Sequence, residues 1–152
     1  MSKQTYFLVS VAVLLGAAYV YFFTDWFRAQ TIQIIPQIRP GRSASRLNPD
    51  VYPVSFLLDD KYPLKSVKVV RADDAATNRY PHALWHMITE SNSAPTKFIV
   101  YGAQIKGMKP SVPKARPEPL QPHVPYQILV DAGKTRGTEK FMTKEIINPA
   151  GQ

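Results

Sequence analysis

An unbroken apolar segment near the N-terminus constrains this chain more than any other feature of its sequence. Residues 6–23 (YFLVSVAVLLGAAYVYFF) form a run of 18 residues without a charge, interrupted only by the hydroxyl of Ser10. As a helix rising about 1.5 Å per residue, the segment would be roughly 27 Å long, which is close to the thickness of a bilayer's hydrocarbon core. We therefore expect one transmembrane helix here, with the rest of the chain forming a domain beside the membrane.

Two other readings of the segment stay open. A cleavable signal peptide would use Lys3 as its basic region and the small residues 16–18 as its cleavage site. A helix buried in a globular protein would carry a polar stripe, which this segment lacks. A retained anchor is favoured by aromatic residues typical of a membrane interface, namely Tyr19, Tyr21, Trp26 and Phe27.

The charges that flank the segment give opposing indications about its orientation. Lys and Arg are more numerous after the segment than before it, which favours a cytoplasmic domain by the positive-inside rule. A short basic tail before a first apolar segment, however, is typical of a signal anchor whose tail stays inside. We expect the second arrangement, with the domain outside the cytoplasm, as in a periplasm. Arg39, Arg42 and Arg46 then form either a solvated linker or a contact for lipid head groups or an acidic partner.

Composition narrows the chemistry of the domain. The chain has no cysteine, which excludes disulfides, zinc–thiolate sites and thiol nucleophiles. Its formal charge of +8 fits an anionic membrane or an acidic partner, and we expect no nucleic acid because no basic helix or aromatic platform accompanies the charge.

Fourteen prolines divide the rest of the chain into short segments and exclude long helices there. We expect about seven strands, and therefore an all-β sandwich. The expected strands cover residues 31–35 (ending at Pro36), 51–58 (ending at Asp59), 64–70, 97–101 (continuing towards Met108), and a hairpin of 126–130 with 139–143. Residues 72–81 are expected to form a loop, and residues 82–89 fit either a helix or a strand. The organisation is then an anchor (1–28), a first strand with a basic linker (29–50), the sandwich (51–144) with a proline-rich loop (109–125), and a tail (145–152).

One stretch resembles a known family. Residues 120–132 (LQPHVPYQILVDA), with Gly137 beyond them, resemble the L-x-P-x-x-x-Y-x-V-x-V-x-A…G stretch of fibronectin type III domains, within the immunoglobulin-like sandwiches. Residues 105–110 (IKGMKP) resemble the end of strand E in that family, although residues 111–119 are inserted between the two pieces. The resemblance implies that Tyr126 begins strand F and bonds back to upstream backbone as a tyrosine corner. Its motif is structural, so it implies a fold and no active site.

Candidates for chemistry are sparse. His82 and His86, four residues apart, are a weak candidate metal pair without an evident third ligand. The adjacent carboxylates at 59–60 and 73–74 fit turns better than acid–base catalysis, and Gly133–Gly137 fits a hairpin turn better than a phosphate loop.

We therefore expect a single-pass membrane protein that is not an enzyme and needs no cofactor. It would present its sandwich to other proteins as an accessory or assembly subunit of a larger membrane complex. The alternatives are a membrane-tethered or secreted ligand- or carbohydrate-binding module that uses His82, Trp85 and His86, and a metal-dependent enzyme.

Overall fold

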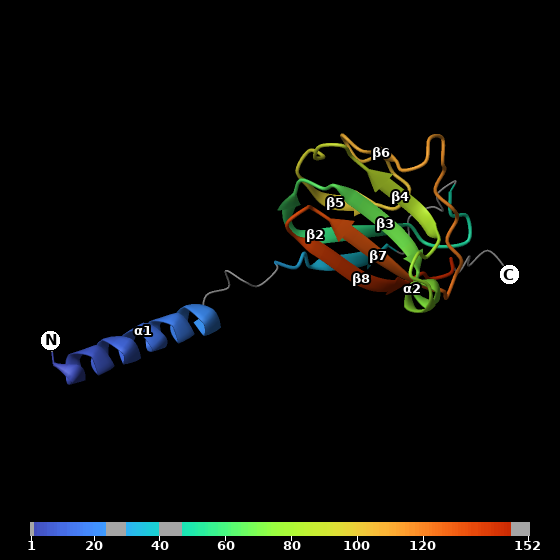
Figure 1. Cartoon of the computed structure of the whole chain (residues 1–152). Coiled ribbons are helices and arrows are strands. Elements are labelled where there is room, and N and C mark those ends of the chain that lie inside the picture. The colour runs from blue at the N-terminus through green and yellow to red at the C-terminus, as the bar shows by residue number, and fades with distance from the viewer. Residues whose placement is uncertain (1, 24–29, 40–46, 147–152) are drawn as a thin grey trace.

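The computed structural model describes residues 2–23, 30–39 and 47–146. One long helix precedes a β-rich body (Figure 1). Its elements are α1 (Lys3–Phe23), β1 (Ile34–Ile38), β2 (Val54–Tyr62), β3 (Ser66–Arg71), α2 (Ala72–Thr77), β4 (Ala83–Ile88), β5 (Thr96–Val100), β6 (Lys109–Pro110), β7 (Pro125–Asp131) and β8 (Arg136–Met142).

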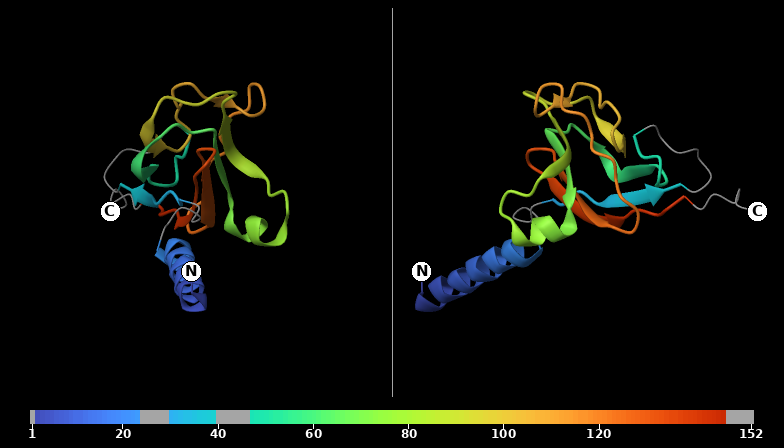
Figure 2. Two further views of the ribbon diagram at one scale, coloured as in Figure 1. Left: turned by 60° about the vertical axis from the view of Figure 1, so that its left-hand side comes forward. Right: turned by 90° about the vertical axis from the view of Figure 1, so that its right-hand side faces the viewer.

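The strands form two antiparallel sheets that face each other, as the views in Figure 2 show. One sheet has the order β1-β2-β5, and the other has the order β6-β4-β3-β7-β8. β3 and β4 are neighbours in the second sheet, and β7 and β8 form the hairpin expected around Gly133–Gly137. The prediction of a mostly β domain arranged as two packed sheets is confirmed.

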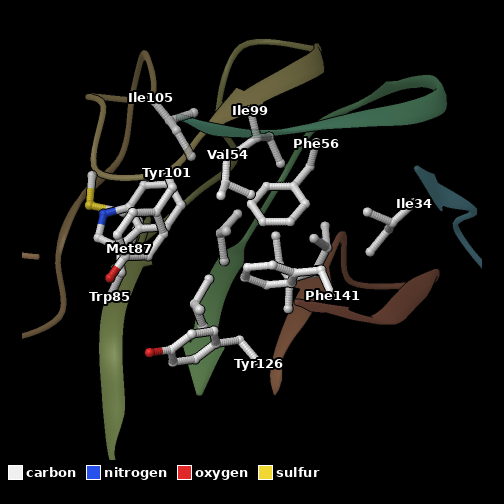
Figure 3. Packing of buried hydrophobic residues seen from close by; sticks show 14 of the residues in the cluster. Ile34, Val54, Phe56, Trp85, Met87, Ile99, Tyr101, Ile105, Tyr126 and Phe141 are labelled. Carbon is white, nitrogen blue, oxygen red and sulfur yellow. The ribbon is translucent and has the colours of Figure 1, made fainter. Parts of the chain in front are cut away.

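The core lies between the two sheets and is largely aromatic and branched aliphatic (Figure 3). Phe56 of β2 meets Phe141 of β8 edge to face, with ring centroids 5.0 Å apart, and Phe141 stacks in turn on Tyr126 of β7 at 5.8 Å. Trp85 of β4 and Tyr101 after β5 make a second aromatic contact between the sheets at 5.4 Å. Edge-to-face and offset pairs of this kind add stabilisation beyond their buried area.

Helix α1 makes no contribution to this core. None of its residues is buried, and within the described part of the chain it is the one helix long and apolar enough to cross a membrane. The hydroxyl of Ser10 donates to the carbonyl of Tyr6 at 2.9 Å, so its polar group is satisfied inside the helix.

Several boundaries predicted from the sequence were wrong. β1 continues through Pro36, which pairs with Phe56. β1 is an edge strand, where a proline costs no ladder hydrogen bond on the open side. β2 likewise continues through the acidic residues 59–60 to Tyr62, so these carboxylates lie at the end of a strand.

Other corrections concern residues 71–108. Residues 72–77 form the short helix α2, whose first turn contains Asp73 and Asp74, where carboxylates are stabilised by the helix dipole. Residues 82–89 contain the strand β4 rather than a helix. The extension from β5 towards Met108 instead turns at Gly102 and Gly107, which have φ angles of 78° and 84° that favour glycine.

The chain that arrives from α1 is fixed to the sandwich beside Gly137. The Ile32 N–H donates to the Arg136 carbonyl at 2.9 Å, and Thr31 forms a parallel bridge with Arg136. A Cβ on Gly137 would lie 2.5 Å from the Ile32 carbonyl oxygen, so only glycine permits this approach. The glycine in the C-terminal half of the hairpin is thus required by the neighbouring backbone.

Tyr126 begins β7 and is only 1% exposed. Its hydroxyl oxygen accepts a hydrogen bond from the Gln121 N–H at 2.9 Å, five residues upstream. This is the contact that the tyrosine at this position was expected to make. It joins the proline-rich loop to the start of β7, an interior strand of the five-stranded sheet.

The Tyr126 hydroxyl supports a first prediction. In Tyr126→Phe, the Gln121 N–H loses its partner while the ring packing is kept, so we expect the free energy of unfolding to fall by about 1–2 kcal/mol. Urea denaturation of the full chain in detergent measures the change. Tyr80→Phe is the matched control, since Tyr80 is exposed. An equal change in the two variants would contradict the structural role of the Tyr126 bond.

Candidate functional site

A cleft beside β4 and a partly exposed apolar row on the opposite sheet are surface features with functional potential. The cleft has a volume of about 540 Å³ and lies between β4 and the proline-rich loop. Two backbone bonds hold the loop there: the Ser111 N–H donates to the His86 carbonyl at 3.0 Å, and the Glu118 N–H donates to the Leu84 carbonyl at 2.9 Å. Between these bonds the loop leaves the strand edge, and the cleft opens.

The structure places His82 and His86 on the cleft but gives them different partners. His82 Nε2 lies 2.5 Å from the Glu118 Oε1, and both side chains are largely exposed. His86 Nε2 lies 3.2 Å from the Ser66 Oγ on the neighbouring strand. Within residues 2–23, 30–39 and 47–146, no three His, Asp or Glu side chains are grouped so that they could hold a metal ion.

Trp85 contributes to the core more than to the cleft. It is 4% exposed, and its ring packs against Tyr101 (Figure 3). Burial is the main cause that raises the pKa of the Tyr101 hydroxyl, which donates to the Glu118 carbonyl at 2.6 Å. The Trp85 ring, which the alternative of a carbohydrate-binding module would use for its ligand, is therefore used for packing.

The electrostatics of His86 follow from its position on β4. The pKa of His86 lies below the usual value of 6.5. Burial of the ring is the larger cause, and the nearby charge of Lys68 is the smaller one. Lys68 is its direct cross-strand partner on β3. The ring is thus held in its neutral form at neutral pH.

The apolar row lies on the outer face of the three-stranded sheet. Ile35 pairs with Leu57, and Leu57 pairs with Phe98, so the three side chains are cross-strand neighbours on one face. Val100, two residues after Phe98, extends the row. Ile35 is 54% exposed and Phe98 45% exposed, whereas their chain neighbours Ile34 and Ile99 are buried. We call Ile35, Leu57, Phe98 and Val100 the outer apolar row.

The predicted membrane and lipid contacts are only partly described. Tyr19 and Tyr21 are exposed on α1, and Tyr19 stacks on Phe23 with centroids 5.1 Å apart. Arg39 is exposed just after β1, and its Nη2 lies 3.5 Å from the Gln37 Oε1. Trp26, Phe27, Arg42 and Arg46 lie outside the described residues.

Sequence reasoning missed the partners that complete these surfaces. Glu118 is 36 positions from His82, and no local pattern links the two. The sequence predicts that Ile35 and Leu57 lie in strands, but it does not predict which face of the sheet they occupy. Alternation from the buried Phe56 to Leu57 was the available signal, but pairing Leu57 with Ile35 and Phe98 required the register of three strands.

Comparisons with models of known protein families, with curated proteins and with solved structures find no match for this chain.

The position of His86 supports a second prediction. Because its pKa is lowered in the folded protein, the unfolded chain takes up this proton more readily as the pH falls through about 6.5. Stability should therefore fall between pH 7 and pH 5.5, and the fall should be smaller in His86→Gln. Urea denaturation at the two pH values measures it. Lys68→Met should also lessen the fall, and a fall in His86→Gln equal to that of the unmodified chain would contradict the prediction.

Proposed function

We propose that this protein is a single-pass membrane protein that presents its β-sandwich to other proteins, as an accessory or assembly subunit of a membrane complex. The observation that carries the proposal is the outer apolar row. Three large apolar side chains aligned across neighbouring strands leave an apolar strip in contact with water unless a partner covers them. Large exposed aliphatic and aromatic side chains are typical of the centre of a protein interface.

The anchor is the second support for this proposal. α1 has the length and composition of a membrane span and buries none of its side chains against the sandwich. A sandwich held beside a bilayer meets other membrane proteins at high local concentration, so a modest contact area suffices for association. We place the sandwich outside the cytoplasm, because the basic Lys3 before the apolar segment favours a signal anchor.

We also propose that the sandwich belongs to the fibronectin type III or immunoglobulin-like class. In these folds the strands named C, F and G are adjacent in one sheet. β3, β7 and β8 are adjacent in that order here, and Tyr126 at the start of β7 makes the upstream backbone bond of a tyrosine corner. The insertion at residues 111–119 then lies in the proline-rich loop beside β4, directly after β6.

A second candidate function is ligand binding in the cleft beside β4, which supports the alternative of a carbohydrate-binding module. The cleft is within the usual size range of small-molecule sites, and His82, Glu118 and Arg116 supply polar groups at its surface. Trp85 is too deeply buried to provide a stacking platform, so recognition there would depend on hydrogen bonds. His82→Ala, which leaves the core intact, is the variant that tests it in a thermal-shift screen of mono- and disaccharides.

The outer apolar row supports a third prediction. Phe98→Ser should reduce the recovery of associated proteins about tenfold or more, because truncating a central interface residue costs roughly 1.4 kcal/mol or more. The measurement is affinity purification of the tagged full chain in mild detergent, followed by quantitative mass spectrometry. The folded stability should change little, since Phe98 is half exposed.

The control is Tyr80→Ser, which removes an exposed aromatic side chain outside the row. Recovery of the unmodified chain alone, without any associated protein, would contradict the assembly role. Equal recovery of partners by Phe98→Ser and the unmodified chain would contradict the role of the row.

A further inference from the structure

The tether between α1 and the sandwich determines which end of the domain faces the membrane. Eight chain steps separate Phe23 from Thr31, and a fully extended chain spans at most about 28 Å over that number. Thr31 and Ile32 are bonded to Arg136 at the start of β8. If α1 spans the bilayer, as proposed above, the end of the sandwich that contains the β7–β8 turn stays within this distance of the membrane surface.

We call this end of the sandwich the tether end. β1 runs away from it, and Ile38 pairs with Val54 at the opposite end. The described Arg39 therefore follows β1 at the far end of the sandwich, as the course of β1 in Figure 1 shows. Because Arg39 lies at the end of the sandwich away from the tether, a contact between Arg39 and lipid head groups is not favoured.

The tether end contains an open hollow of about 610 Å³. Four segments form its walls: Gln30 before β1, the β2–β3 connection, the loop after β4 and the β7–β8 turn. The lining residues include Gln30, Tyr62, Lys65, Asn92, Gly133 and Lys134. None of the residues that line it is acidic. We call it the basic hollow.

Two lysines give the hollow its charge. The Lys65 side chain lies over Gly133, with its Cε 3.1 Å and its Nζ 3.2 Å from the position that a Cβ on Gly133 would take. A side chain at position 133 would therefore displace the ammonium group. In the described residues neither Lys65 nor Lys134 makes an ion pair.

Two carboxylates of the loops around the hollow are paired with basic side chains, and a third, that of Asp59, accepts a hydrogen bond from the Tyr62 hydroxyl at 3.1 Å. Asp131 accepts from the Gly133 N–H at 2.7 Å and pairs with Arg136 at 3.3 Å. Glu90 pairs with Lys109 at 2.5 Å. Basic side chains at the tether end outnumber acidic ones: Lys61, Lys65, Lys97, Lys106, Lys109, Lys134 and Arg136 against Asp59, Asp60, Glu90 and Asp131.

Backbone hydrogen bonds hold the walls of the hollow in place. The Lys65 N–H donates to the Asp131 carbonyl at 2.7 Å, and the Lys65 carbonyl accepts from the Thr89 N–H at 3.1 Å. The turn itself is closed by the Ala132 N–H, which donates to the Thr135 carbonyl at 2.9 Å. The backbone positions of both lysines are thus set before any ligand arrives.

We propose that the basic hollow docks the sandwich on the bilayer by binding the head groups of anionic phospholipids. The ammonium groups of Lys65 and Lys134 contact the lipid phosphate, and Gln30 and Asn92 offer further amide donors. Each lysine near the membrane is attracted to an anionic surface, whereas a neutral surface exerts no such attraction. The inference rests on the proposed anchor, and it fixes the orientation in which the outer apolar row is presented to neighbouring proteins.

The test uses the full chain in nanodiscs of phosphatidylcholine alone and in nanodiscs with one-third phosphatidylglycerol. Hydrogen exchange measured by mass spectrometry should slow about threefold or more in residues 62–66 and 131–136 in the anionic nanodiscs. The slowing should disappear in the double variant Lys65→Gln, Lys134→Gln and in about 1 M salt. The control, Lys140→Gln with Lys144→Gln, removes the same charge from the other end of the hairpin and should keep the slowing.

Four outcomes would overturn the proposal. Equal hydrogen exchange in neutral and anionic nanodiscs would exclude head-group binding. If both double variants lost the slowing of exchange to the same extent, the net charge of the domain, and not the hollow, would explain it. Protection by an acidic protein partner, without any protection by lipid, assigns the hollow to a protein instead. Failure of the chain to enter nanodiscs, read from co-elution with the discs, removes the anchor as well, whereas entry without protection removes only this inference.

Discussion

The backbone contact between Ile32 and Gly137 determines how the two parts of this protein are joined. It holds the start of the sandwich against the β7–β8 hairpin, and the absence of a side chain at position 137 permits the approach. With the apolar helix in a bilayer, as proposed above, the same contact would hold the hairpin turn near the membrane. The antiparallel pairing of β1 with β2 then carries Arg39 to the opposite end of the sandwich.

The two faces of the three-stranded sheet serve different purposes. Its inner faces pack Phe56, Phe141 and Tyr126 into one aromatic contact across the core. The outer face of the three-stranded sheet keeps Ile35, Leu57 and Phe98 in an aligned row that no described element covers. Burial of the inner residues stabilises the fold, so the outer row is available for association without cost to the core.

Local sequence patterns predicted the features that depend on neighbouring residues. The apolar helix, the hairpin around Gly133–Gly137 and the buried Val67 and Val69 of β3 follow from runs and alternation. Pro36 was misread because its tolerance depends on β1 being an edge strand, which is a property of the whole sheet. The pairs Asp73–Asp74 and Ala75–Ala76 were a usable signal for α2, since acids in a first turn and alanines favour a helix. The outer apolar row and the basic hollow required strand register, because their residues are far apart in the sequence.

We propose that α1 lies in a bilayer with the sandwich outside the cytoplasm, and cysteine labelling tests this arrangement directly. The chain has no cysteine, so single variants Leu14→Cys and Tyr80→Cys can be labelled in intact cells with a membrane-impermeant maleimide. Both side chains are exposed on the protein itself, so only a bilayer can distinguish them. We expect Tyr80→Cys to be labelled in intact cells, whereas Leu14→Cys should stay unlabelled until the membrane is dissolved. Labelling of Leu14→Cys as readily as Tyr80→Cys would contradict the membrane span, and labelling of Tyr80→Cys only after lysis would place the sandwich in the cytoplasm.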